Sequence, residues 1–187
     1  SSGNKISKKS LYVTIFIVVL MVSSVIGFVA FSGQGENKIK ADYEYNGFEF
    51  TKINNGWITK INSRDIYFDY LPEEVKDISY DNSKLSTQSK VYIAYDPSKE
   101  NIDFVLSKLD NNIRLLGYNT NLACVKSENC PDIPVINCQD KDNIIFLKID
   151  SKNSIYRDNG CIVIEGVDVI GLAKASDRFI YSISGVI

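Results

Sequence analysis

The stretch "VYIAYDPSKENIDFVLSKLDNNIRLLG", residues 91–117, carries the signals of a strand followed by a helix. Its start, Val91–Asp96, is apolar or aromatic up to the aspartate, which is typical of a buried strand. Apolar residues then recur on one helical face, and Gly117 supplies the stop. That face consists of Ile102, Val105, Leu106, Leu109, Ile113 and Leu116. A strand followed by an amphipathic helix indicates a mixed α/β (α+β) fold.

The C-terminal part continues this pattern. Three further segments are predicted as buried strands: Ile133–Cys138, "NIIFLKID" (143–150) and "NGCIVIEG" (159–166). Between the last two, residues 151–158 predict a turn or a short extra strand. A final helix follows in "DVIGLAKASDRFIYSISGVI", with Asp168 as its N-cap. Asp177 and Arg178 within it are expected to form surface or inter-element ion pairs. Residues 90–187 are therefore predicted to form a β-α-β-β-β-α globular domain.

The segment before this domain predicts a short β-meander. "FEFTKI" (48–53), "GWITKI" (56–61) and "DIYFDYL" (65–71) are aromatic and β-branched runs separated by asparagine-containing turns. A helix start follows at Pro72, with two glutamates in its first turn. We therefore predict a meander subdomain over 43–82, with the polar stretch 83–90 as the seam to the α/β domain.

Residues 11–31, "LYVTIFIVVLMVSSVIGFVAF", contain no charge. As a helix they would extend about 31 Å, which matches a hydrocarbon core of about 30 Å. The small residues Ala30 and Ser32 also fit a cleaved signal peptide, but the apolar run is longer than the 7–15 residues usual for one. We therefore expect an uncleaved transmembrane helix that contacts the lipid bilayer, followed by a spacer over 32–42.

The charge distribution indicates topology and excludes some functions. The chain has 21 basic and 23 acidic residues, a net charge of −2 and no histidine. Lys5, Lys8 and Lys9 in the tail 1–10 predict a cytoplasmic N-terminus, which places the C-terminal domain outside the cell. The remaining 18 basic residues against 23 acidic ones argue against a nucleic-acid partner. Without histidine, Ser-His-Asp and Cys-His catalysis and His-ligated metal sites are excluded.

Four cysteines, Cys124, Cys130, Cys138 and Cys161, are the most informative polar positions. Their gaps do not form the two C-x₂₋₄-C knuckles of a zinc site or the C-x-x-C of a thiol-disulfide enzyme. An even number of cysteines outside the cytoplasm is expected to be oxidised. Three pairings are possible, and we expect Cys124–Cys130 and Cys138–Cys161.

Four acidic residues are candidate ligand-facing groups. Asp140 and Asp142 fall in a predicted turn, where oxygen-rich loops can bind calcium, but the full D-x-D-x-D-G pattern is missing and a solvated turn is expected. Glu165 and Asp168 lie near a strand end, where clefts of α/β proteins form. A carboxylate pair there could serve hydrolysis. No catalytic residue, metal or cofactor is assigned.

Two blocks, "NGFEFTKINNGWITKINSRDIYFDYLPEEVKDI" and "CIVIEG…DRFIYSISGVI", resemble uncharacterised single-pass membrane proteins of archaea. The resemblance covers residues 48–187 and includes Gly56-Trp57 and Asp96-Pro97. It implies an extracytoplasmic domain on an N-terminal anchor and supplies no activity. Cys124 and Cys130 stand outside the shared pattern.

These observations favour a membrane-anchored extracytoplasmic domain that is a structural or protein-binding component of the cell envelope, with another envelope protein as its partner. Two alternatives stay open. An envelope thiol-disulfide protein requires an accessible cysteine of low pKa. A carboxylate-based hydrolase requires Glu165 or Asp168 in a cleft with a second acid about 5–10 Å away.

Overall fold

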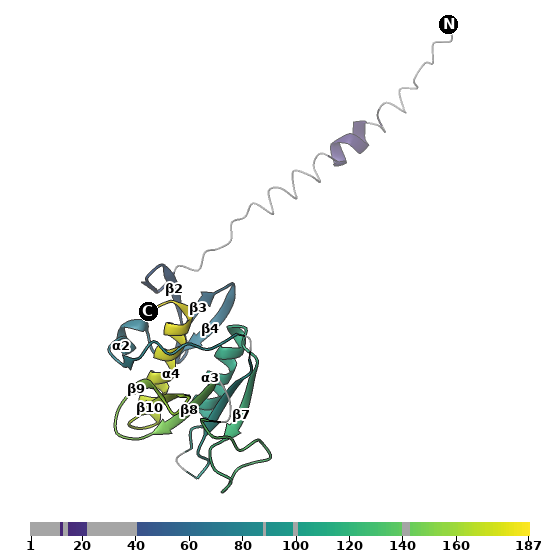
Figure 1. Cartoon of the computed structure of the whole chain (residues 1–187). Helices are drawn as coiled ribbons and strands as arrows, with labels where there is room; N and C mark the ends of the chain where they lie inside the picture. The colour runs from purple at the N-terminus through teal and green to yellow at the C-terminus, as the bar shows by residue number, and fades with distance from the viewer. Residues whose placement is uncertain (1–11, 13–14, 22–40, 88, 99–100, 140–142) are drawn as a thin grey trace. The chain divides into compact units, whose positions relative to one another are not determined.

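The computed structural model of the chain describes residues 12, 15–21, 41–87, 89–98, 101–139 and 143–187 (Figure 1). The chain divides into two compact units, residues 1–40 and residues 41–187. The predicted tail 1–10, most of segment 11–31 and residues 32–40 of the spacer lie outside the described residues. Residues 15–21 are helical, and within the described ranges no helix is both long and apolar enough to cross a membrane.

The second unit begins with the predicted meander, which has one strand more than expected. Four antiparallel strands pair in chain order: β1 (Tyr43–Tyr45), β2 (Phe48–Ile53), β3 (Gly56–Ile61) and β4 (Arg64–Phe68). The turn between β1 and β2 is Asn46-Gly47, and both residues have positive φ, of 48° and 81°. Asparagine and glycine tolerate this conformation, which lets a two-residue turn close the hairpin.

The rest of the unit forms a mixed sheet with helices. The elements are α2 (Pro72–Val75), β5 (Ser79–Tyr80), β6 (Val91–Tyr95), α3 (Asp103–Leu115), β7 (Thr120–Cys124), β8 (Ile144–Ile149), β9 (Ser154–Asp158), β10 (Cys161–Gly166) and α4 (Val169–Ser184). The strand order is β5-β9-β10-β8-β6-β7. The four strands β10, β8, β6 and β7 are parallel, and β9 runs antiparallel to β10. The prediction of a mixed α/β fold is confirmed.

One predicted strand is misplaced. Residues Ile133–Cys138 form a single bridge, between Val135 and Cys124. The strand that follows α3 is instead β7, which pairs with β6 at the edge of the sheet. Prolines at 131 and 134 remove backbone donors, so residues 133–138 cannot sustain a ladder. β7 was not predicted because it begins with two polar residues, Thr120 and Asn121, although Thr120 is buried. Residues 151–158 do contain a full strand, β9, so the order after residue 90 is β-α-β-β-β-β-α.

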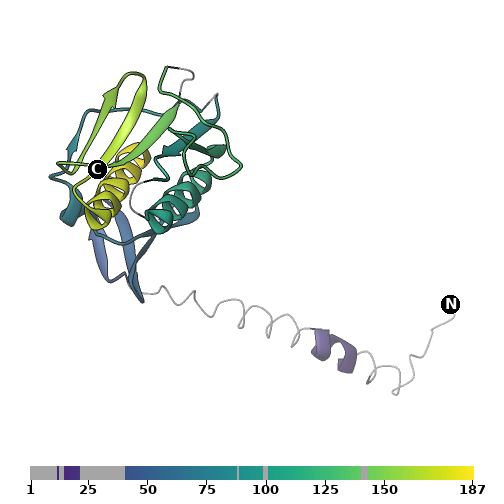
Figure 2. The same ribbon diagram turned by 90° about the horizontal axis from the view of Figure 1, so that it is seen from below.

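Both long helices cover one face of the six-stranded sheet, where α3 and α4 lie side by side (Figure 2). The meander packs against these helices: Phe68 of β4 stacks on Tyr181 of α4, with ring centroids 4.0 Å apart. Residues 43–82 and 90–187 therefore share one hydrophobic core. The polar stretch 83–90 runs within this compact unit.

The opposite face of the six-stranded sheet is covered by the loop after β7. Ile136 of that loop joins a smaller buried cluster with Ala94, Ala123, Ile144 and Val163. This leaves the sheet covered by helices on one side and by a loop on the other. The carboxyl ends of the parallel strands lie at one edge of the sheet, between the helices on one face and the loop on the other.

Candidate functional site

A crevice opens where two parallel strands separate. The ladder between β6 and β8 ends at the pair Ala94 and Phe146, whereas β8 continues beside β10 as far as Ile149 and Gly166. In the described part of the chain, β8 thus has no strand partner on its β6 side after Phe146. The resulting crevice has a volume of about 320 Å³.

The position of the crevice follows from the chain connections. After β6 the chain passes through α3 to β7 on one side, and after β8 it continues to β9 and β10 on the other side. Connections that leave neighbouring parallel strands in opposite directions cannot fill the space between the strand ends. Ligands of open α/β sheets bind in such crevices. This makes the β6/β8 crevice the candidate binding site.

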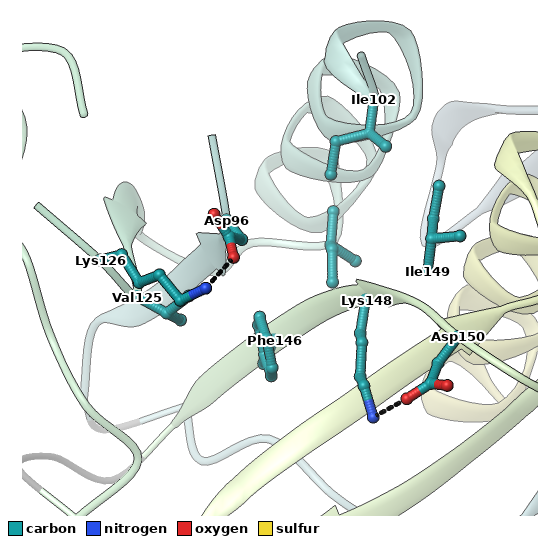
Figure 3. Close-up of a pocket in the computed structure, with 9 residues that line it drawn as sticks. Asp96, Ile102, Val125, Lys126, Phe146, Lys148, Ile149 and Asp150 are labelled. Atoms are coloured by element: carbon teal, nitrogen blue, oxygen red, sulfur yellow. Dashed lines mark ion pairs between the residues drawn. The ribbon is translucent and has the colours of Figure 1, made fainter. Parts of the chain in front are cut away.

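Two ion pairs flank an apolar floor in the crevice (Figure 3). Lys126 Nζ lies 2.7 Å from Asp96 Oδ2, and Lys148 forms an ion pair with Asp150. Asp96 follows β6 directly and Asp150 follows β8 directly, so both acids are placed by the strand ends. The apolar lining comes from Ile102, Val125, Phe146, Leu147 and Ile149.

The ion pairs favour the charged forms of Asp96 and of both lysines. The hydrogen bond from Lys126, followed by those from Ser98, lowers the pKa of Asp96 to about 2. The same bond to Asp96 raises the pKa of Lys126, and the bond to Asp150 raises the pKa of Lys148. A general acid or base works best with a pKa near the ambient pH. This arrangement is therefore suited to binding a polar group and poorly suited to proton transfer.

Of the predicted acidic residues, Glu165 and Asp168 are not among those that line this crevice. Glu165 is 2% exposed and accepts hydrogen bonds from the backbone N–H groups of Ser151 and Lys152, at 3.1 and 3.2 Å. It also accepts from the Tyr156 hydroxyl at 2.6 Å, and the pKa of Tyr156 is raised to about 12, first by burial and then by this bond. Glu165 thus holds the β8–β9 loop in place.

Asp168 is the N-cap of α4, as predicted. Its carboxylate accepts a hydrogen bond of 2.6 Å from the Gly171 N–H. The carboxylates of Glu165 and Asp168 are thus both engaged with backbone donors. The other two candidates, Asp140 and Asp142, lie outside the described residues.

The four cysteines form the two expected pairs. Cys124 is bonded to Cys130 with a Cα–Cα distance of 6.1 Å, and Cys138 to Cys161 with 4.9 Å. The first closes a small loop after β7, and the second ties the covering loop to the start of β10. None of the four is a free thiol.

The two disulfides are expected to differ in their contribution to stability. Replacing both Cys138 and Cys161 with serine should lower the free energy of unfolding by about 3 kcal/mol, and replacing Cys124 and Cys130 by about 2 kcal/mol, because the longer loop restricts the unfolded chain more. Denaturant unfolding of both double variants checks this. Equal losses, or a larger loss for the short loop, would contradict loop closure as the dominant effect.

The crevice was not predicted from the sequence, although the sequence contains a signal for two of its residues. Asp96 and Asp150 are each the last residue of a predicted strand, and acids at the carboxyl ends of parallel strands meet at one sheet edge. The lysines carry no such signal: Lys126 lies in a loop, and Lys148 was read only as part of its strand.

Neither protein-family models, nor curated proteins, nor solved structures give a match to this chain. The resemblance to archaeal membrane proteins gains no support from them.

Proposed function

We propose that this chain is a membrane-anchored extracytoplasmic domain that acts in the cell envelope by binding, as a structural or protein-binding component. Residues 11–31 form the anchor, with the N-terminus in the cytoplasm and residues 41–187 outside. The observation that carries this proposal is the pairing of all four cysteines in two disulfides. Such bonds persist in oxidising compartments and are rare in the cytosol.

Binding is favoured over catalysis by the state of the polar groups. The crevice acids are neutralised by lysines. A carboxylate hydrolase is disfavoured because Glu165 and Asp168 are occupied by backbone donors. A thiol-disulfide role is disfavoured because each bond includes a fully buried cysteine, Cys124 or Cys161, that lies in a strand rather than at a helix N-terminus.

The proposed location is tested on the full chain in the membrane of a bacterial host, with an epitope tag at each end. Protease added to intact spheroplasts should remove the C-terminal epitope and spare the N-terminal one. Lysis before protease addition should expose both. If the C-terminal epitope survives in intact spheroplasts and is lost only after lysis, the proposed topology is wrong.

The disulfide state is tested on the same chain, purified without reductant. Its intact mass should be four hydrogen atoms lower than that of the reduced chain, which corresponds to two disulfides. An alkylating reagent should modify no cysteine until the chain is both unfolded and reduced. Rapid labelling of the folded chain near neutral pH would favour the thiol-disulfide alternative instead.

A further inference from the structure

Three exposed apolar side chains of residues 41–187 lie together in one groove, outside the β6/β8 crevice. Phe104 at the start of α3 is 67% exposed, Tyr67 of β4 is 42% exposed, and Ile53 at the end of β2 is 38% exposed. All three line an open groove of about 680 Å³ between the meander and α3. Single exposed apolar residues are ordinary, whereas a cluster of them marks a surface that contacts a membrane or another protein.

The sheet register explains why the apolar residues of the meander gather at one end. Ile58 of β3 pairs directly with Tyr67 of β4, and Ile53 lies opposite Gly56 at the end of the β2–β3 hairpin. Because side chains alternate between the two faces of a strand, Ile53, Ile58 and Tyr67 share one face. That face is turned away from Phe68 and the core. These three residues therefore extend the apolar surface of the groove onto the outside of the meander.

The groove lies at the end of the meander where the chain enters it. Asp42 directly precedes β1, and its carboxylate accepts a hydrogen bond of 2.7 Å from the N–H of Lys52, which lines the groove. In the proposed anchor the membrane-spanning segment ends at residue 31. The eleven residues 32–42 then limit the distance from the bilayer to this end of the meander to at most about 40 Å. A tether this short allows a surface of weak intrinsic affinity to dock.

The charges at the groove favour a lipid surface over a charged partner. Lys108 lines the groove, but its charge is compensated by ion pairs with Asp69 and Asp177. The Lys52 ammonium lies over the ring of Trp57, 5.8 Å from its centroid. Tryptophan and tyrosine are enriched at the membrane–water interface, where a lysine can extend its ammonium group toward the headgroups. An apolar groove with an aromatic and lysine rim suits this boundary of a bilayer.

We propose that the groove lined by Ile53, Tyr67 and Phe104 docks on the surface of the bilayer in which the chain is anchored. These three side chains lie at the boundary between headgroups and acyl chains in the docked state. The contact is mainly apolar, so it requires no anionic lipid. This proposal deepens the envelope role proposed above and rests on its membrane anchor.

The test uses the full chain in phosphatidylcholine vesicles, with one tryptophan as the probe. Trp57 is the single tryptophan of the chain, so Trp57→Phe gives a background in which Phe104→Trp places the probe in the groove. Val135→Trp in the same background is the control, because Val135 is 51% exposed in the loop on the other face of the six-stranded sheet. Lipids with brominated acyl chains should lower the emission at position 104 about twofold or more and leave that at position 135 unchanged.

Two pairs of substitutions, added to the chain with the probe at position 104, test the groove itself. Ile53→Ser with Tyr67→Ser should restore most of the quenched emission, because it removes the apolar contact. The matched control is Val167→Ser with Ile170→Ser, which replaces residues that are 48% and 60% exposed but are not among those that line the groove. It should leave the quenching unchanged.

The same vesicles separate failure of the anchor from failure of the docking. A chain that alkaline carbonate strips from the vesicles contradicts the proposed anchor, and the docking proposal fails with it. If the chain stays in the vesicles but position 104 is quenched no more than position 135, the docking alone is refuted and a protein partner is favoured for the groove. Equal quenching in the two serine pairs would likewise refute a role for Ile53 and Tyr67.

Discussion

Replacing Lys108 with alanine is expected to destabilise the chain by about 3–5 kcal/mol at pH 8, because the change leaves a buried charge without its partner. Asp177 of α4 is fully buried, and its carboxylate lies 2.7 Å from Lys108 Nζ of α3. Lys108 also forms an ion pair with Asp69, just after β4. The remaining bonds to Asp177 come from the N–H groups of Asp69 and Tyr70 and carry no full charge.

The cost of Lys108→Ala should shrink as the pH falls. Burial raises the pKa of Asp177 to about 6, even though Lys108 opposes the shift. Without Lys108 that pKa rises further, so Asp177 takes up a proton already in mild acid and the buried charge disappears. Unfolding by urea, measured at pH 8 and at pH 5, should show the smaller loss at pH 5.

The unfolding free energy of the unmodified chain should also depend on pH, because Asp177 titrates in the folded state. Here the control is Asp177→Asn. Because the folded-state pKa of Asp177 lies above its unfolded value of about 3.9, the stability that this group contributes is full below about pH 4 and is lost as the pH rises through about 6. Asp177→Asn should remove this component. If the difference in unfolding free energy between the two chains is constant from pH 4 to pH 8, Asp177 does not titrate as described.

A surface lysine provides the comparison for Lys108. Lys60 pairs with Asp65 at 2.7 Å, but both side chains are well exposed. Lys60→Ala should cost no more than about 1 kcal/mol, since exposed pairs are solvated and screened. Combining Lys108→Ala with Asp177→Asn should recover part of the loss, because the uncompensated charge is then gone. A loss for Lys108→Ala no larger than that for Lys60→Ala would refute the account.

Replacing Phe68 with alanine is expected to lower the free energy of unfolding by about 3–5 kcal/mol, because it leaves a cavity where the meander packs against α4. Phe68 is 1% exposed, stacks on Tyr181 and meets Phe50 edge-on, with ring centroids 6.5 Å apart. Tyr181 in turn donates a hydrogen bond of 2.7 Å to the Tyr70 carbonyl. The loss should appear as a lower midpoint of one cooperative unfolding transition for residues 41–187.

The neighbouring residue supplies a control in the same strand. Tyr67 points to the other face of β4 and is 42% exposed, so Tyr67→Ala should cost at most about 1 kcal/mol. Two separate transitions in Phe68→Ala, followed by circular dichroism and by Trp57 fluorescence, would mean that the meander unfolds on its own. That result would favour the subdomain boundary that the sequence suggests at 83–90.

Much of the fold could be predicted from local sequence patterns. The helix after β6 could be predicted because Val105, Leu106, Leu109 and Ile113 repeat at the spacing of one helical face, and all four are buried. The later two meander turns and the N-cap of α4 could likewise be predicted, since asparagine turns and an aspartate cap act on backbone groups a few residues away.

Sequence alone therefore predicted both long helices, most of the strands, the cap at Asp168 and the expected cysteine pairs, because each depends on spacing or composition along the chain. Only the tertiary structure decided that β7 rather than 133–138 lies beside β6, that Asp177 is buried against Lys108, and that β6 and β8 part after Phe146. Strand order and burial depend on contacts between residues far apart in the chain, and no local pattern specifies them. The crevice and its two ion pairs exist only because those distant strand ends meet.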